Sequence, residues 1–448
     1  MTQTHDLTTG SISKKLVLFF IPIAIGTLFQ QLYNTVDAVV VGKFVGTEAL
    51  AAVGGSAAQI SALTIGFFIA LTAGASAVIA QLSGARLSED VSKAVHSAFT
   101  FSILAGILLT AIGIPLTPAV LSWMDTPPDT MLDSVTYLRI YFSGSVFMLL
   151  FNMGSSILQA LGDSKHPLYY LIACCFCNIV LDLLFVVGLH MGIAGAALAT
   201  VISQLVSSVL IIHRFRRMNT AYQLFFSKMG IDRQLMGKML RIGIPAGLQA
   251  SMYNISNLII QIGINSLMTV AVAAWSMSTK VDGIYSAIST ALGVAVMGFV
   301  GQNYGAGKTD RVKKTLLVSM KIFLPVTLVM GAIVLLFSKY CLHIFLDDPE
   351  VIQCTWEIML YFAPVYCLWT TIEIISGALR GIGDAVKPLI ITVLGICVFR
   401  LLWVWIVFPR IHTIGGLSLC YPISWLLTAI ALGLHYKKQG WFSRGSRK

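Results

Sequence analysis

Five polar residues within otherwise apolar stretches carry the chemistry that this sequence can offer. Asp37 and Asp182 each stand in a long apolar run, where an ionisable group is costly unless it is paired or hydrated. Asn178 precedes Asp182 by four residues, so the two side chains share one face of a helix. Thr200 and Tyr137 fall near the corresponding ends of neighbouring runs. At about 1.5 Å of rise per residue, we expect Asp37, Tyr137, Asp182 and Thr200 to meet in the outer half of the first lobe of the chain.

Such a group is suited to binding a small cation. Two carboxylates in a low-dielectric pocket cannot both stay ionised at low cost, so they titrate as a pair. Asp37 and Asp182 therefore predict a site for a proton, or for a sodium ion shared with Asn178 and Thr200. The alternative is that both aspartates only cap or bridge neighbouring helices. We also expect the first helix to bend at Pro22, about four turns before Asp37, because a proline removes a backbone hydrogen bond.

The composition places these residues in a membrane. Hydrophobic residues make up 57% of the chain and charged residues 11%, against roughly 25% charged in soluble domains. Each apolar run is long enough to cross a hydrocarbon core of about 30 Å as a helix, and only helices satisfy the backbone of such segments in lipid. We therefore expect an all-α integral membrane protein with twelve transmembrane helices. The runs cover about 16–41, 50–80, 94–119, 135–160, 167–188, 192–213, 242–267, 274–300, 314–337, 356–379, 388–408 and 414–435.

An internal repeat divides these helices into two halves. The segment 158–167 is echoed at 379–388, and the same offset relates Gln81 and Gly84 to Gln302 and Gly305. We expect a six-helix lobe over 1–213, a basic linker over 214–241 and a second six-helix lobe with a basic tail over 242–448. Two similar bundles that rock around a site between them are typical of transporters.

The net charge of +11 has a topological meaning in such a protein. Lysine and arginine gather in the linker and at the carboxyl end, and basic loops stay in the cytoplasm. We therefore expect a multi-pass protein of the cell (inner) membrane with both termini cytoplasmic, and no nucleic-acid partner. The first apolar run is too long for a cleavable signal peptide and has no small-residue cleavage site.

Nothing in the sequence predicts an enzyme, a cofactor or a structural metal. The stretch 301–309 ends like a phosphate-binding loop, but Gln302 stands where the first glycine belongs and no strand precedes it. We interpret it as the glycine-rich end of a long helix. The eight cysteines contain no CxxC pair, and the histidines lack ligand spacing. We expect no metal beyond Na⁺.

The second half holds further charges in its apolar runs. Glu373 and Arg400 either neutralise each other as a structural ion pair or form a second cation site. Lys280 and Asp282 are two residues apart, so they do not share a helix face. The further polar candidates in this half are Asn254 and Asn257.

Other side chains are candidates for a substrate cavity. Methionine and aromatic groups form surfaces that adapt to varied compounds, although such residues more often only pack. The first helix adds a polar face. The candidates are Gln30, Gln31, Asn34, Met148, Phe151, Met252, Tyr253, Met277 and Trp369.

These features resemble the multidrug and toxic compound extrusion (MATE) family over essentially the whole chain. The resemblance is carried by the helix from Pro22 to Asp37, the QxxGA helix ends, the LGD and GIGD turns and the two six-helix halves. It implies a cation site in the first lobe, formed by Asp37, Tyr137, Asn178, Asp182 and Thr200. The chain resembles the DinF branch more than the NorM branch, because the seventh helix lacks the glutamate of NorM-like members.

We expect a secondary active multidrug exporter and not an enzyme. It would move amphipathic, often cationic, organic compounds out of the cell in antiport with H⁺ or Na⁺, as a monomer in the lipid bilayer. The alternative is a flippase for lipid-linked oligosaccharide or a polysaccharide exporter of the same superfamily. Such a protein would need a strongly basic cavity.

Overall fold

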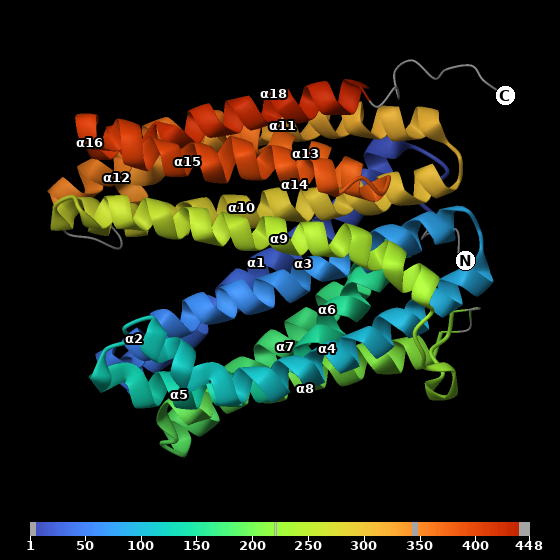
Figure 1. The fold of residues 1–448 in the computed structure, drawn as a ribbon, viewed down its shortest axis with the longest axis horizontal. Coiled ribbons are helices and arrows are strands. Elements are labelled where there is room, and N and C mark those ends of the chain that lie inside the picture. The colour runs from blue at the N-terminus through green and yellow to red at the C-terminus, as the bar shows by residue number, and fades with distance from the viewer. Residues whose placement is uncertain (1–5, 219, 221, 343–347, 439–448) are drawn as a thin grey trace. The chain divides into compact units, whose positions relative to one another are not determined.

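The computed structural model describes residues 6–218, 220, 222–342 and 348–438, and over this part of the chain all regular structure is helical. Figure 1 shows most of the helices as long rods. They are α1 (Ile12–Phe44), α2 (Thr47–Gly54), α3 (Ser56–Gly84), α4 (Ser88–Trp123), α5 (Pro128–Ser143), α6 (Ser145–Ala160), α7 (Lys165–Asp182), α8 (Gly192–Arg216), α9 (Arg233–Asn265), α10 (Thr269–Gly305), α11 (Thr309–Leu342), α12 (Pro349–Phe362), α13 (Tyr366–Gly381), α14 (Val386–Thr392), α15 (Phe399–Leu402), α16 (Phe408–Ile411), α17 (Ile414–Ser418) and α18 (Cys420–Lys438).

Short segments of other helix types interrupt this pattern. The π-helical segments are η1 (Leu183–Gly188), η4 (Val393–Val398) and η5 (Trp403–Val407). Two short 3₁₀ turns, η2 (Phe226–Lys228) and η3 (Ala363–Val365), complete the described elements. Such π-helical turns inside α-helices often accompany functional sites.

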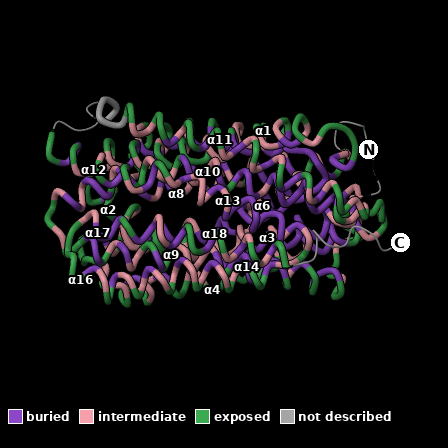
Figure 2. Tube along the Cα trace, turned by 90° about the horizontal axis from the view of Figure 1, so that it is seen from above, coloured by how far each residue is buried: buried purple, intermediate pink, exposed green. Residues whose placement is uncertain are grey.

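The helices are those of a multi-pass membrane protein. Within the described residues, ten helices are long and apolar enough to cross a membrane, or eleven if α5 and α6, which meet at 52°, form one span. Figure 2 shows buried and exposed residues alternating along the helices, as expected where one face meets protein and the other meets lipid. The expectation of an all-helical membrane protein is confirmed.

The chain forms two compact units. Unit 1 contains Phe19–Gly247, and unit 2 contains Leu7–Leu18 together with Leu248 and the residues that follow it. Helices α1 and α9 therefore each contribute to both units. The lobes expected over 1–213 and 242–448, with a linker at 214–241, stay a prediction.

Glycines allow close helix contacts inside each unit. In unit 1, a Cβ on Gly243 of α9 would lie 2.5 Å from the backbone oxygen of Leu71 on α3. In unit 2, a Cβ on Gly377 of α13 would lie 2.4 Å from the backbone oxygen of Gly293 on α10. Small residues at such crossings let helix backbones approach and gain packing contacts, which is the main source of helix association in lipid.

Helix ends in the two units share one geometry. Gly162 after α6 and Gly383 after α13 have φ of +88° and +96°. The amide of Asp163 donates to Leu158 O at 2.8 Å, and that of Asp384 donates to Leu379 O at 2.9 Å. This is the Schellman arrangement, which satisfies the last carbonyls of a helix.

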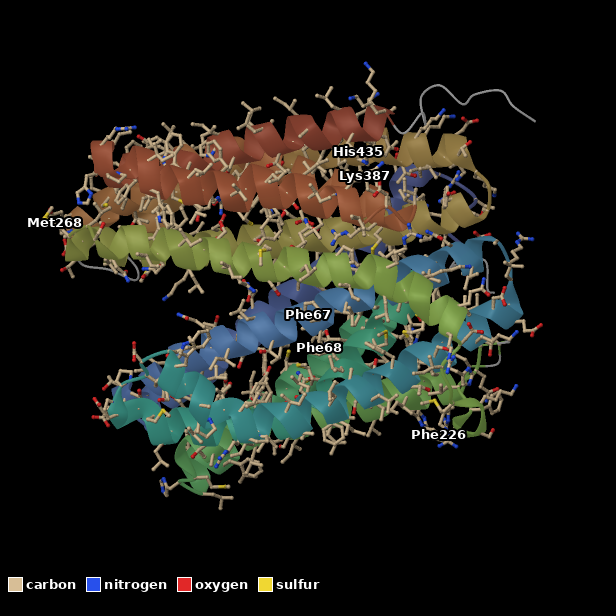
Figure 3. The ribbon with its side chains drawn as sticks, in the orientation of Figure 1. Phe67, Phe68, Phe226, Met268, Lys387 and His435 are labelled. Atoms are coloured by element: carbon tan, nitrogen blue, oxygen red, sulfur yellow. The ribbon has the colours of Figure 1, made fainter. Side chains whose placement is uncertain are left out.

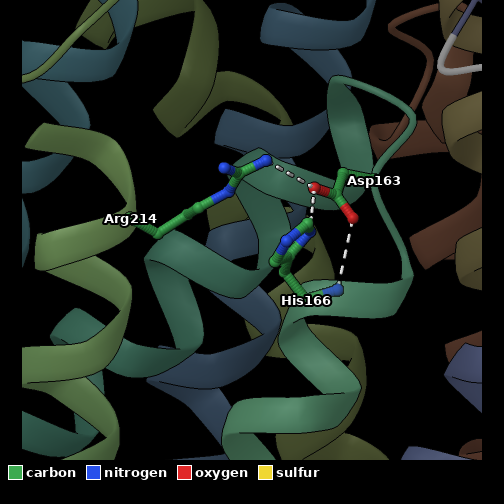
Figure 4. A network of polar contacts seen from close by, with 3 residues as sticks. All are labelled: Asp163, His166 and Arg214. Atoms are coloured by element: carbon green, nitrogen blue, oxygen red, sulfur yellow. Dashed lines mark hydrogen bonds and ion pairs between the residues drawn. The ribbon is translucent and has the colours of Figure 1, made fainter. Parts of the chain in front are cut away.

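The aspartate of each turn contacts the last helix of its half of the internal repeat. Asp163 Oδ2 lies 2.6 Å from His166 Nδ1 and 3.7 Å from Nη2 of Arg214 on α8, as Figure 4 shows. Asp384 Oδ2 lies 2.9 Å from Nε2 of His435 on α18, which is labelled in Figure 3. Both turns are therefore tied to a helix that is distant in sequence.

The stretch that imitates a phosphate-binding loop is a helix end. The amide of Lys308 donates to Asn303 O at 2.9 Å, and Gly307 has a φ of +70°, which confirms the interpretation made from the sequence. Polar side chains of this stretch, together with Arg311 just after it, bind the backbone of residues 7–10, which precede α1. The contacts are Leu7 N to Gln302 Oε1 (3.1 Å), Asn303 Nδ2 to Leu7 O (3.2 Å), Lys308 Nζ to Thr8 O (2.8 Å), Arg311 Nη1 to Gly10 O (2.9 Å) and Arg311 Nη2 to Leu7 O (3.3 Å).

Candidate cation site

Unit 1 brings the five predicted residues into one buried cluster. Asp37 comes from α1, Tyr137 from α5, Asn178 and Asp182 from α7, and Thr200 from α8. Asn178 and Asp182 are 0% exposed and Asp37 is 9% exposed. The two carboxyl groups are near enough for the charge of Asp37 to act on Asp182.

Several buried polar atoms of this cluster lack hydrogen-bond partners within the described protein. Asp37 Oδ1, both carboxylate oxygens of Asp182 and both amide atoms of Asn178 are buried and have no hydrogen-bond partner among the described residues. An ionised carboxylate only accepts hydrogen bonds, so these carboxylate oxygens need a donor or a cation as their partner. A buried acceptor without a partner costs about 1–3 kcal/mol, and more if it is charged. The cluster is thus suited to receiving a proton or a cation that prefers oxygen ligands.

Two tyrosines extend the cluster beyond the predicted residues. Tyr33 on α1 donates its hydroxyl to Thr200 Oγ1 at 3.4 Å. The ring of Tyr141 stacks on that of Tyr137 with centroids 5.8 Å apart, and the charge of Asp37 acts on both Tyr33 and Tyr141. Each lies four residues from a predicted member of the cluster, so helical spacing from Asp37 and Tyr137 is the signal that could have found them.

Local helix geometry fixes how the cluster is presented. Asp182 is the last α-helical residue of α7, and the π-helical segment η1 begins at the next residue. Thr200 donates back to Ala196 O at 3.1 Å, a bond that settles its hydroxyl within α8. Pro22 is buried inside α1, which the structure shows as a single helix from Ile12 to Phe44. Bending at Pro22 stays a prediction.

Unit 2 pairs its buried glutamate differently from the expectation. Glu373 Oε2 lies 3.7 Å from Nη2 of Arg380, which is on the same helix. The same oxygen would lie 2.8 Å from a Cβ on Gly293, so the carboxylate packs directly against α10. The ion pair expected between Glu373 and Arg400 is therefore wrong: the partner is an arginine seven residues along α13, two turns away on one face.

Arg400 has its own surroundings in unit 2. Its guanidinium carbon lies 3.7 Å from the ring centroid of Tyr421, and Nη1 donates to Asn257 Oδ1 at 3.5 Å. The charge of Arg400 also acts on Asp282. Lys280 is exposed and Asn254 is half-buried.

The expected substrate residues fall into three environments. Met148 and Phe151 are buried in unit 1, where Met148 packs with Ile65 and Leu149, in agreement with the packing alternative. Gln30, Gln31 and Asn34 are exposed on α1. In unit 2, Met252, Tyr253, Met277 and Trp369 are half-buried, and the rings of Tyr253 and Trp369 meet edge to face at 5.5 Å.

The fold and this cluster define a class of all-helical membrane transport proteins, and comparison with known proteins gives the family. The MatE family matches residues 22–184 and 245–406. The chain belongs to the MatE family. The DinF and NorM branches are not distinguished by this match.

Individual relatives agree with that assignment. The chain is 29% identical over 402 residues to "Probable multidrug resistance protein YoeA" of Bacillus subtilis, covering 88% of this chain and 86% of the relative. It is 25% identical over 443 residues to "FAD transporter" of Shewanella oneidensis, covering 96% of each. The solved structure of a MOP superfamily transporter from Pyrococcus furiosus has the same fold, with a TM-score of 0.91, 23% identity and 99% coverage of both chains.

Proposed function

We propose that this protein is a secondary active multidrug exporter that exchanges organic compounds for H⁺ or Na⁺. The observation that carries the proposal is the burial of Asp37 and Asp182, whose charges interact, in one cluster with oxygens that have no hydrogen-bond partner among the described residues. A relative named as a probable multidrug resistance protein supports the export of varied compounds. Transport without chemical conversion agrees with membership of this family.

The cluster supplies the coupling step. Neutralisation of Asp37 or Asp182 by an external cation removes the repulsion between the carboxylates. It also removes the charge that holds α1 in place. Helix α1 then bends near Pro22 and releases the compound to the outside. One charge that moves through 100 mV contributes roughly 2.3 kcal/mol, which is the energy that drives the exchange.

The proposed architecture has twelve transmembrane helices in two lobes related by the repeat. Helix α9, with 33 residues, is long enough to be the twelfth span, although its first turns carry Arg233, Lys238 and Arg241. The repeat is supported by φ values of +59° at Arg86 and +70° at Gly307, which occupy equivalent positions in the two halves. The basic linker and tail support an inner-membrane location with cytoplasmic termini.

The described part of α9 that follows Arg241 has no acidic residue: it offers Tyr253, Asn254, Ser256 and Asn257. This absence supports a DinF-like protein over a NorM-like one. We place the coupling cation in unit 1 alone, because Glu373 is engaged by Arg380.

For the compounds themselves, we propose amphipathic and often cationic molecules, handled by a monomer in the bilayer without a cofactor. A flippase of lipid-linked oligosaccharide is the second candidate. The observation that favours it is the buried cation Arg400, because a pyrophosphate group needs positive partners. One relative, named as a FAD transporter, adds phosphate-bearing compounds to the range to be tested.

The deciding experiment is efflux of a fluorescent cationic dye from proteoliposomes under an imposed pH gradient or an imposed sodium gradient. We expect one gradient to drive transport in the wild type and the Asp37→Asn variant to abolish it. The control is Asp129→Asn, an exposed aspartate at the start of α5, which should transport normally. Absence of dye movement under both gradients would contradict the proposal and favour the flippase.

A further inference from the structure

One buried cation in unit 2 has no role in the coupling step. Arg400 is only 4% exposed, and its Nε has no hydrogen-bond partner among the described residues. Its guanidinium stacks on Tyr421 and makes one long hydrogen bond to Asn257. An arginine carries five N–H donors, and a buried donor without a partner is costly. The side chain therefore has donors left for another group.

The acids of unit 2 do not use these donors. Asp282 on α10 is near enough for its charge to act on that of Arg400, but no ion pair within 4.0 Å joins these two described side chains. Glu373, the buried acid on α13, is paired with Arg380. A buried guanidinium that lacks a bonded carboxylate is a favourable place for an anion.

The position of Arg400 in the fold is also unusual. It lies in the single α-helical turn α15, between the π-helical segments η4 and η5. In the internal repeat, its aromatic partner Tyr421 is the equivalent of Thr200, and Arg400 itself is the equivalent of Ile179, the neighbour of Asn178. Unit 2 thus places a cation at the sequence positions where unit 1 places its acidic cluster.

We propose that Arg400, with Asn257 and Tyr421, binds a carboxylate or phosphate group of the exported compound. This inference rests on the proposed function and adds a substrate class to it: organic compounds that carry an anionic group, alone or beside a cationic one. The planar guanidinium presents paired donors that match two oxygens of such a group. Asn257 is exposed on α9, so the group is not sealed within unit 2.

The test compares two dyes that differ in one charge: rhodamine B, which has a free carboxylate, and its ethyl ester. Their binding to the full-length protein is measured by fluorescence anisotropy in phosphatidylcholine nanodiscs without any gradient. We expect Arg400→Gln to raise the Kd of rhodamine B about tenfold, the effect of about 1.4 kcal/mol, and to leave that of the ester within about twofold. Arg400→Lys should fall between, because lysine lacks the paired donors.

Controls separate this role from a structural one. Arg410→Gln changes an exposed arginine of α16 and should leave both dyes unaffected. If Arg400→Gln does not fold, Asn257→Ala carries the same comparison, with an expected change of about threefold for rhodamine B alone. An equal change for both dyes, or none for either, would overturn the proposal.

A final arm distinguishes the source of the anion. Phosphatidylglycerol added to the nanodiscs should not weaken the binding of rhodamine B. Competition that disappears in Arg400→Gln would assign the site to a lipid headgroup and overturn the proposal. Because binding is measured without a gradient, a failure of gradient-driven efflux would contradict the proposed function and leave this result standing on its own.

Discussion

The ammonium group of Lys308 donates a hydrogen bond of 2.8 Å to the backbone oxygen of Thr8. Together with the contacts from Gln302, Asn303 and Arg311, it anchors the residues before α1 to unit 2. The same helix carries Asp37 in unit 1. Helix α1 is thus fixed at its beginning by one unit and carries an acid of the candidate cation site in the other.

Removal of this anchor should impair transport without removing the cation site. Arg311→Ala deletes hydrogen bonds to Leu7 and Gly10, each worth about 1.5–3 kcal/mol because the donor is charged. We expect faster amide exchange over 7–18, measured by hydrogen–deuterium exchange, and efflux reduced about tenfold. Lys314→Ala, an exposed lysine of the same helix, is the control. Unchanged efflux together with a released segment would show that the anchor has no part in transport.

Asp37 and Asp182 should act as one unit. Both residues are buried and the charge of Asp37 acts on Asp182, so replacing either one should remove a proton or cation that the two share. We expect Asp182→Asn to lower gradient-driven dye efflux at least about tenfold, and the Asp37→Asn, Asp182→Asn double variant to be no worse than either single variant. Efflux rates of all three, measured against the wild type, complete the cycle. Losses that multiply in the double variant would mean that the two aspartates act independently.

His435 and Arg214 should be interchangeable as partners of the helix-end aspartates. They occupy equivalent positions in the internal repeat and contact Asp384 and Asp163 respectively. We expect His435→Arg to keep the thermal stability of the wild type and His435→Leu to lose about 1–3 kcal/mol, because it leaves a partly buried carboxylate without this partner. Thermal unfolding in detergent, followed by circular dichroism, measures both. Equal melting temperatures for the two variants would show that the contact contributes nothing.

The crossing of α10 and α13 should not tolerate a methyl group. Gly377→Ala places a Cβ 2.4 Å from Gly293 O, and overpacking of this kind costs about 1–3 kcal/mol. Gly433→Ala on α18 meets no atom within 4 Å, so the gain in helix propensity of up to about 1 kcal/mol should be retained. The two melting temperatures should move in opposite directions. A stable Gly377→Ala variant would refute the close contact.

Several features of this protein can be predicted because they depend on composition and helical period. Apolar runs indicate membrane helices, and the distance of a residue from the end of a run gives its depth. Depth predicts that Asp37, Tyr137, Asp182 and Thr200 lie together, and the structure buries all four in unit 1. That they bind a cation stays a prediction. Tyr33 and Tyr141 are harder to predict as members, because aromatic residues in such runs more often only pack.

Pairing between side chains is harder to predict than depth. The sequence suggests Arg400 as the partner of Glu373, because both are rare charges within apolar runs. Depth does not say which way a side chain points around its helix, and the structure pairs Glu373 with Arg380. Glu373 and Arg380 are seven residues apart, a spacing that places both on one face of a helix. The glycines that follow Arg380 indicate a turn, however, so the sequence does not single out Arg380 as the partner of a buried acid.

The sequence by itself predicted a lipid environment, the helices and their approximate ends, because these follow from hydrophobicity and from the regular rise of a helix. Only the tertiary structure decided that Gln302, Asn303, Lys308 and Arg311 bind the segment before α1, and that Arg400 stacks on Tyr421. Those contacts join residues that are far apart in the chain. They depend on how helices pack and rotate against one another, and no local pattern encodes that information.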